Sequence, residues 1–195
     1  MSMKNVSFRE IGAQIAKKVS KEIEVKKDIP FELVSQDKIE EAKKLVEQLD
    51  FSLMKRKMIE YNGLEEEFVD RAISDYKNFL TLLVAYKDIY TGFVPNDFID
   101  EAWHQHILDT RGYYADCMLL FGELIHHDPY LGLRGESDIA NWEKASYITA
   151  YVYNYHFGKK IFDDVVARGC SAQACWAGET ARGCSAQACW AGKDK

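Results

Sequence analysis

The sequence predicts an all-α single domain of about six helices, followed by a flexible C-terminal tail. Apolar residues recur at three- and four-residue spacing through most of residues 7–158, which is the pattern of amphipathic helices. No stretch of useful length alternates apolar and polar residues as a half-buried strand would. Beyond residue 166 the pattern gives way to a twelve-residue segment that occurs twice. We therefore divide the chain into a helical domain at 1–158, a linker at 159–166 and a tandem repeat tail at 167–195.

The length and charge of the chain limit what it can do. Its 195 residues suffice for one domain with a substantial core. The formal net charge of −6 argues against binding to nucleic acid or anionic lipid, because no overall positive field attracts either. Basic residues interrupt every apolar run near the N-terminus, and no apolar stretch is long enough to span a bilayer. We expect a soluble cytoplasmic protein with no membrane partner, whose thiols are kept reduced.

Three helices are expected in the first half of the domain. The first spans residues 7–24. The second begins at the capping residue Ser35 and continues to about residue 61, with a kink near 50–52. The third spans 64–87 and opens with three glutamates, which suit the positive end of a helix dipole. The apolar positions that carry these predictions include Ile11, Ile15, Val19, Ile39, Val46, Phe68, Tyr76 and Leu83.

Three more helices are expected in the second half. Two span residues 97–108 and 111–122, and the last is capped by Ser137 and ended by Gly158. The His-His-Asp-Pro segment at 126–129 is expected to be irregular. The helical domain thus brings a histidine-rich stretch into its middle.

That stretch contains a candidate metal site. Asp100 and His104 lie four residues apart, so a helix places them on one face. His106 is turned by roughly 200° from His104, so a regular helix does not let the two histidines share a metal ion. A site could form from Asp100 and His104 with a ligand from another segment, either His127 or Cys117. Such a mixture of oxygen, imidazole and thiolate suits zinc or iron.

A purely structural interpretation of the same stretch stays open. Asp100 would then orient His104, Trp103 would pack in the core, and the segment beginning at His127 would turn the chain. Cys117 lies in the middle of an expected helix, where a buried cysteine usually acts as a small apolar residue. An enzyme that uses this His/Asp/Cys constellation is the weakest of the hypotheses, and we assign no catalytic residue.

The order and spacing of this stretch resemble a known family. Its motif residues are Asp100, Trp103, His104, His106 and Leu108, followed by Tyr114, Cys117, Phe121-Gly122 and His127-Asp128-Pro129. In this arrangement the chain is similar to the glycine-rich-domain-containing-protein-like family over about residues 35–158. The resemblance implies a helical domain followed by a low-complexity tail, and members of that family from plants are associated with development and stress responses. Nucleic-acid binding has been suggested for glycine-rich tails, but the tail of this chain is not a glycine run.

The tail carries four of the five cysteines. The segment ARGCSAQACWAG at 167–178 returns unchanged at 181–192. Two copies with a period of 14 are too few and too short for a solenoid, and the tail has little to bury, so we expect it to be flexible. Four thiolates could hold zinc or an iron–sulfur cluster, or each repeat could form a reversible disulfide. These candidate ligands are Cys170, Cys175, Cys184 and Cys189.

A third interpretation makes the repeat a substrate for covalent modification. A serine and a cysteine four residues apart could form a thioether ring after dehydration of the serine, and each repeat also places a thiol beside an indole. Identical repeats suit a peptide that is processed to the same product twice. The candidate modification sites are Cys170, Ser171, Cys175, Trp176, Cys184, Ser185, Cys189 and Trp190.

From the sequence we predict a non-enzymatic carrier domain that presents its repeated tail to a peptide-modifying enzyme, as the precursor of a modified peptide. The alternative is a metal-binding protein that uses the tail thiolates, the Asp/His cluster, or both, with zinc or iron as the metal. A duplicated tail without function is the remaining hypothesis.

Overall fold

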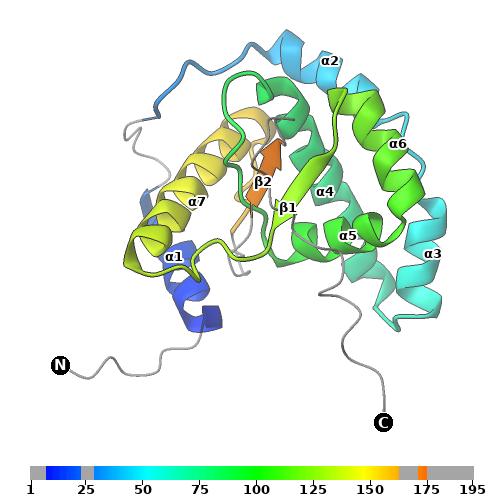
Figure 1. The fold of residues 1–195 in the computed structure, drawn as a ribbon, viewed down its shortest axis with the longest axis horizontal. Coiled ribbons are helices and arrows are strands. Elements are labelled where there is room, and N and C mark those ends of the chain that lie inside the picture. The colour runs from blue at the N-terminus through cyan, green and yellow to red at the C-terminus, as the bar shows by residue number, and fades with distance from the viewer. Residues whose placement is uncertain (1–7, 23–28, 163–170, 175–195) are drawn as a thin grey trace, which may run out of the picture.

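The computed structural model describes residues 8–22, 29–162 and 171–174, and these form a helical domain with one small sheet (Figure 1). The predicted all-α fold is confirmed, with seven helices among the described residues. The helices are α1 (Phe8–Glu22), α2 (Gln36–Val46), α3 (Ser52–Glu60), α4 (Glu66–Tyr86), α5 (Asp97–Leu108), α6 (Thr110–Phe121) and α7 (Glu136–Phe157). The strands are β1 (Ile125–Asp128) and β2 (Ser171–Ala174).

The helix expected from Ser35 to residue 61 is two helices. Ser35 caps α2 as predicted, because its hydroxyl accepts a hydrogen bond from the backbone N–H of Lys38. The chain then leaves the helix after Val46, and the Oδ1 atom of Asp50 accepts a hydrogen bond from the backbone N–H of Ser52 at 2.9 Å. An aspartate that bonds the backbone two residues ahead favours a turn over a continuous helix. The expected kink is therefore a break.

Helix α4 is the centre of the domain. It packs against α2, α3, α5 and α7, so nearly every side of its second half is covered. Tyr76, Phe79, Leu82 and Tyr86 all have no exposed surface. A helix that is apolar on every side is expected only in the middle of a domain. The elements that carry the histidine-rich stretch are assembled around this helix.

The fold differs from prediction at the two ends of the loop that precedes α7. Residues 125–128 form β1, where we expected irregular chain, and its backbone pairs antiparallel with β2. The pairing joins Ile125 to Ala174 and Asp128 to Ser171. Such a strand is too short to give an alternating pattern in the sequence.

At the other end, Ser137 is not the cap of α7, because the helix already begins at Glu136 and Gly135 holds the capping position.

The ends of the domain are tied to this core. Helix α1 packs against α7, and Lys18 of α1 forms an ion pair with Glu143 of α7. Beyond α7, Ile161 and Phe162 are both buried. The side-chain amide of Asn96 donates to the carbonyl of Ile161 at 2.6 Å, which fixes this segment beside the start of α5. Among the described residues, no helix has the length and apolar character needed to cross a membrane.

Candidate metal centre

Helix α5 presents two of the candidate ligands one turn apart. Asn96 fixes the start of the helix, because its Oδ1 atom accepts a hydrogen bond from the backbone N–H of Ile99 at 2.9 Å. Asp100 and His104 then share a face, and the Nδ1 atom of His104 lies 3.7 Å from the Oδ2 atom of Asp100. The helical spacing therefore brings these two side chains together as predicted.

The third residue arrives from β1. The Nε2 atom of His127 lies 3.0 Å from the Oδ1 atom of Asp100. The ring of Trp103 meets the His127 ring edge-on, with centroids 4.7 Å apart. At the end of the strand, the carboxylate of Asp128 accepts hydrogen bonds from the backbone of Tyr130 and from the guanidinium of Arg134. These contacts hold the strand and its histidine in a defined position against α5.

Together the three side chains form a cluster that we call the Asp/His cluster, composed of Asp100, His104 and His127. One ligating atom from each lies within 4.8 Å of the others. Ligands of a tetrahedral zinc ion at bond lengths of about 2.0–2.2 Å lie about 3.4 Å apart, so small side-chain movements would suffice to surround an ion. The Asp100 and His127 side chains are only 5% and 9% exposed, whereas that of His104 is 46% exposed. The cluster is thus anchored in the interior and opens to solvent on one side.

Cys117, which we considered as a fourth ligand, lies elsewhere. It is buried on α6 and is not a member of the Asp/His cluster. Burial raises the pKa of its thiol, partly opposed by hydrogen bonds involving Ile125 and Tyr113. This environment is typical of a cysteine that acts as an apolar residue and not of a reactive or ligating thiolate.

His106 occupies a separate buried site, as its position on the helix predicted. Its Nδ1 atom lies 3.0 Å from the hydroxyl of Tyr76, and its Nε2 atom lies 3.0 Å from Oδ2 of Asp116. Burial lowers the pKa of this imidazole, and the neighbouring Asp116 carboxylate opposes that shift. A neutral imidazole satisfies both contacts, since its Nε2–H can donate to Asp116 while Nδ1 accepts from Tyr76. The sequence does not reveal Tyr76 and Asp116 as partners of His106, because only the packing of α4, α5 and α6 brings them to it.

Most of the tail sites lie outside the described residues. This applies to the four candidate thiolates and to Trp176, Ser185 and Trp190. Ser171 is described only as the first residue of β2, opposite Asp128. The metal, redox and modification hypotheses for the tail therefore stay predictions.

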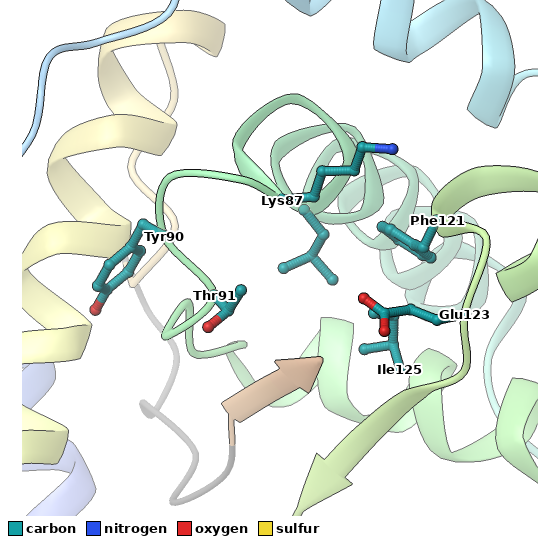
Figure 2. A pocket seen from close by; sticks show the side chains of 7 residues that line it. Lys87, Tyr90, Thr91, Phe121, Glu123 and Ile125 are labelled. Atoms are coloured by element: carbon teal, nitrogen blue, oxygen red, sulfur yellow. The ribbon is translucent and has the colours of Figure 1, made fainter. Parts of the chain in front are cut away.

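A pocket lies close to the start of β1, between the loop after α4 and the end of α6 (Figure 2). Its volume is about 20 Å³, which is room for about one water molecule. Its lining combines apolar side chains with a lysine and a glutamate. These residues are Leu83, Lys87, Tyr90, Thr91, Phe121, Glu123 and Ile125.

A comparison with protein-family models finds a match. The family model described as UCP032817-like matches residues 40–165. No curated protein and no solved structure matches the chain. The resemblance to the glycine-rich-domain-containing-protein-like family is therefore wrong. It rested on the spacing of a few aromatic and histidine residues, and such a pattern can arise wherever two helices pack through similar side chains.

Proposed function

The chain belongs to the UCP032817-like family, and we propose that it binds one divalent transition-metal ion, zinc or ferrous iron, through Asp100, His104 and His127. The observation that carries this proposal is that three side chains able to ligate a metal converge from α5 and β1 to within 4.8 Å.

The ligand types favour zinc or iron over the alkaline-earth ions. Calcium and magnesium prefer sites made entirely of oxygen atoms, whereas imidazole suits zinc and iron. Two histidines with one carboxylate occur in catalytic zinc sites and in non-haem iron sites, and both kinds keep a coordination position open. The half-exposed His104 would place this open position at the surface, within reach of a small molecule.

The burial of Asp100 also supports a cation at this point. A carboxylate that is removed from water is costly unless a positive charge or hydrogen bonds compensate it. A metal ion would supply that charge. The competing explanation is that contacts within the protein satisfy the carboxylate, among them His127 at 3.0 Å and His104 at 3.7 Å, which is the structural interpretation of the cluster.

The test must separate the Asp/His cluster from the tail thiolates, which are also candidate zinc ligands. We would use the full chain with Cys170, Cys175, Cys184 and Cys189 replaced by serine, strip it with a chelator, and titrate it with Zn²⁺ and, without oxygen, with Fe²⁺. Calorimetry gives the affinity, and elemental analysis gives the stoichiometry. We expect one ion per chain.

The matched variants are His104→Ala and His126→Ala. His104 is exposed, so its replacement should leave the fold intact while lowering affinity by at least about 100-fold, the upper range for loss of a partner near a metal. His126 is the neighbour of His127 on β1 but is not in the Asp/His cluster, so its replacement should change nothing. An absence of stoichiometric binding, or equal affinity in the two variants, would refute the proposal.

A second candidate function is the carrier role predicted from the sequence. It is favoured by the pairing of Ser171–Ala174 with β1, because the helical domain would hold part of the first repeat in an extended form. Extended peptide added to a sheet edge is a common way of presenting a segment to a partner. The partner would be an enzyme that modifies cysteine, serine or tryptophan in the repeat.

Intact mass spectrometry of the protein from its native host tests this second candidate. A covalent mass change confined to residues 167–192 is expected, and its size would identify the chemistry. An unmodified tail would remove the support for the carrier role and leave metal binding by the Asp/His cluster unaffected.

A further inference from the structure

A groove lies between α4, the end of α7 and the residues that follow α7, and its volume of about 500 Å³ is within the range of small-molecule sites. Its lining combines positively charged and hydroxyl side chains with one carboxylate. These residues include Arg71, Ser74, Asp75, Tyr153, Lys159 and Lys160. None of them belongs to the Asp/His cluster, so the groove is a separate feature of the domain.

The groove carries a local positive charge in an acidic protein. Arg71, Lys159 and Lys160 contribute three positive charges and Asp75 one negative charge, which leaves +2, whereas the whole chain has a net charge of −6. Lys55 of α3 forms ion pairs with two carboxylates of α4, but within the described part of the chain neither lysine of the groove forms an ion pair. Like charges that are held close together repel each other, and a bound anion would relieve that repulsion.

Arg71 is held in position by contacts on both sides of its guanidinium group. The guanidinium carbon lies 4.1 Å from the centroid of the Phe98 ring, and Nε lies 3.6 Å from Oδ2 of Asp75. The Asp75 carboxylate also accepts a hydrogen bond from the hydroxyl of Tyr153 at 3.2 Å, so it has partners within the protein and supports Arg71. The ion pair is made through Nε, and the terminal nitrogens form the planar fork that suits a phosphate group.

The backbone that carries the two lysines is fixed at both ends. Gly158 ends α7 with a positive φ of 62°, and its N–H donates to the carbonyl of Asn154 at 2.8 Å. After the lysines, Ile161 is buried, and its carbonyl accepts a hydrogen bond from the side-chain amide of Asn96 at 2.6 Å. The lysine side chains themselves are exposed. They therefore line the groove from a short segment whose path is set by the core.

From this arrangement we propose that the groove binds the phosphate group of a small phosphorylated molecule. One guanidinium and two ammonium groups match the charge and the several acceptor oxygens of a phosphate dianion, and the hydroxyl of Ser74 supplies a further donor. A carboxylate has one charge and two oxygens, so it engages fewer of these donors. Nucleic acids and anionic membranes need an extended positive surface, which a chain with a net charge of −6 does not provide. The inference is independent of metal binding.

A titration of the full chain with inorganic phosphate at constant ionic strength, followed by ¹H–¹⁵N NMR, tests the proposal. The protein is first treated with a chelator, so that phosphate cannot bind through a metal ion at the Asp/His cluster. We expect saturable shifts of the amide resonances of Ser74, Lys159 and Lys160, with half-saturation near about 1 mM, because free phosphate carries only the group that the groove recognises. Acetate, titrated in the same way, should bind at least about 10-fold more weakly.

The matched variants are Lys160→Gln and Lys144→Gln. Both replace an exposed lysine, but Lys144 lies on α7 and does not line the groove. Lys160→Gln should weaken phosphate binding about 10-fold, through the loss of one hydrogen bond from a charged donor. Lys144→Gln should change it by less than about twofold, because solvent screens charges outside the groove. Shifts that do not saturate, equal affinity for phosphate and acetate, or equal losses in the two variants would overturn the proposal.

Discussion

The Nε2 atom of His127 lies 3.0 Å from the Oδ1 atom of Asp100, and this contact between two buried side chains joins β1 to α5. The Trp103 ring supports His127 from one side, and the ring of His104 lies 4.7 Å from it on another. The contact therefore fixes the orientation of the His127 imidazole relative to that of His104. A metal ion that bound here would meet ligands whose positions are already set by packing, which lowers the entropic cost of binding.

The Tyr76–His106 pair should stabilise the domain through a buried hydrogen bond. Replacing His106 with leucine leaves the Tyr76 hydroxyl in the core without its 3.0 Å partner, and we expect a loss of about 2–4 kcal/mol in the free energy of unfolding. Tyr76→Phe alone should cost less, about 1–2 kcal/mol. The double variant should lose about 1 kcal/mol less stability than the sum of the two single losses, because the two residues share one hydrogen bond. Urea denaturation of the four proteins measures this coupling, and strictly additive effects would show that the hydrogen bond contributes nothing.

Cys117 should react slowly in the folded protein. Its side chain is 3% exposed, and burial raises the pKa of the thiol, so little of it is present as thiolate at neutral pH. Alkylation by iodoacetamide at pH 8 should be on the order of 100-fold slower than in urea. The four cysteines of the tail also react with iodoacetamide, so the alkylation of Cys117 has to be followed separately by peptide mass mapping. Equal rates in the folded and denatured protein would contradict the buried position of this residue.

His156 should make the domain sensitive to acid. Burial lowers the pKa of this histidine to about 4, and its Nε2 atom lies 2.7 Å from the hydroxyl of Tyr86. The unfolded chain takes up the proton near pH 6.5 and the folded chain only near pH 4, so acid favours the unfolded state between these values. His156 does not lower the free energy of unfolding above pH 6.5. Near pH 4 it lowers that free energy by up to about 3 kcal/mol.

The variant His156→Gln isolates this effect, because glutamine keeps an acceptor for Tyr86 and does not titrate. The free energy of unfolding of the variant should fall less between pH 6.5 and pH 4 than that of the unaltered chain. Chemical denaturation at a series of pH values gives both curves. Parallel curves would mean that His156 takes up its proton without a penalty.

The helical domain should fold without its tail. A chain that ends after Val166 should melt cooperatively, within about 1 kcal/mol of the full chain, because it retains all the helices of the described residues. A chain that ends after Gly158 is the matched control. It lacks the buried Ile161 and Phe162 and the carbonyl that Asn96 binds, so it should lose about 3–5 kcal/mol. A gradual, non-cooperative melt of the longer truncation would show that the domain depends on the repeat.

The spacing of apolar residues predicted the helical fold class, because helix formation depends on residues that are close together in the sequence. The same local logic placed Asp100 beside His104 and turned His106 away from both, as the structure shows. It could not decide between His127 and Cys117 as a further member of the Asp/His cluster. That choice depends on the path of the chain after α6, where Gly122 takes a positive φ of 76° and redirects the chain into β1.

Other differences arise from contacts that a pattern of residue types does not contain. The break between α2 and α3 follows from one hydrogen bond made by Asp50. The start of α7 is set by Asp138, whose carboxylate accepts hydrogen bonds from the backbone of Gly132 and Arg134 and so orders the turn before the helix. Ser137 satisfied the residue preference for a cap, but this turn places Gly135 in that position instead.

The opposed directions of His104 and His106 on α5 have a practical consequence. The two imidazoles are separated by a single residue of chain, yet one side chain is 46% exposed and the other 7%. The imidazole C2 proton exchanges for deuterium, and mass spectrometry of one short peptide can follow this exchange at both residues. The measurement would therefore compare the exposed and the buried face of α5 within a single sample. A ligand that binds to the exposed side of α5 would slow the exchange at His104. The exchange at His106 would be unaffected and would report, in the same sample, how often the core opens.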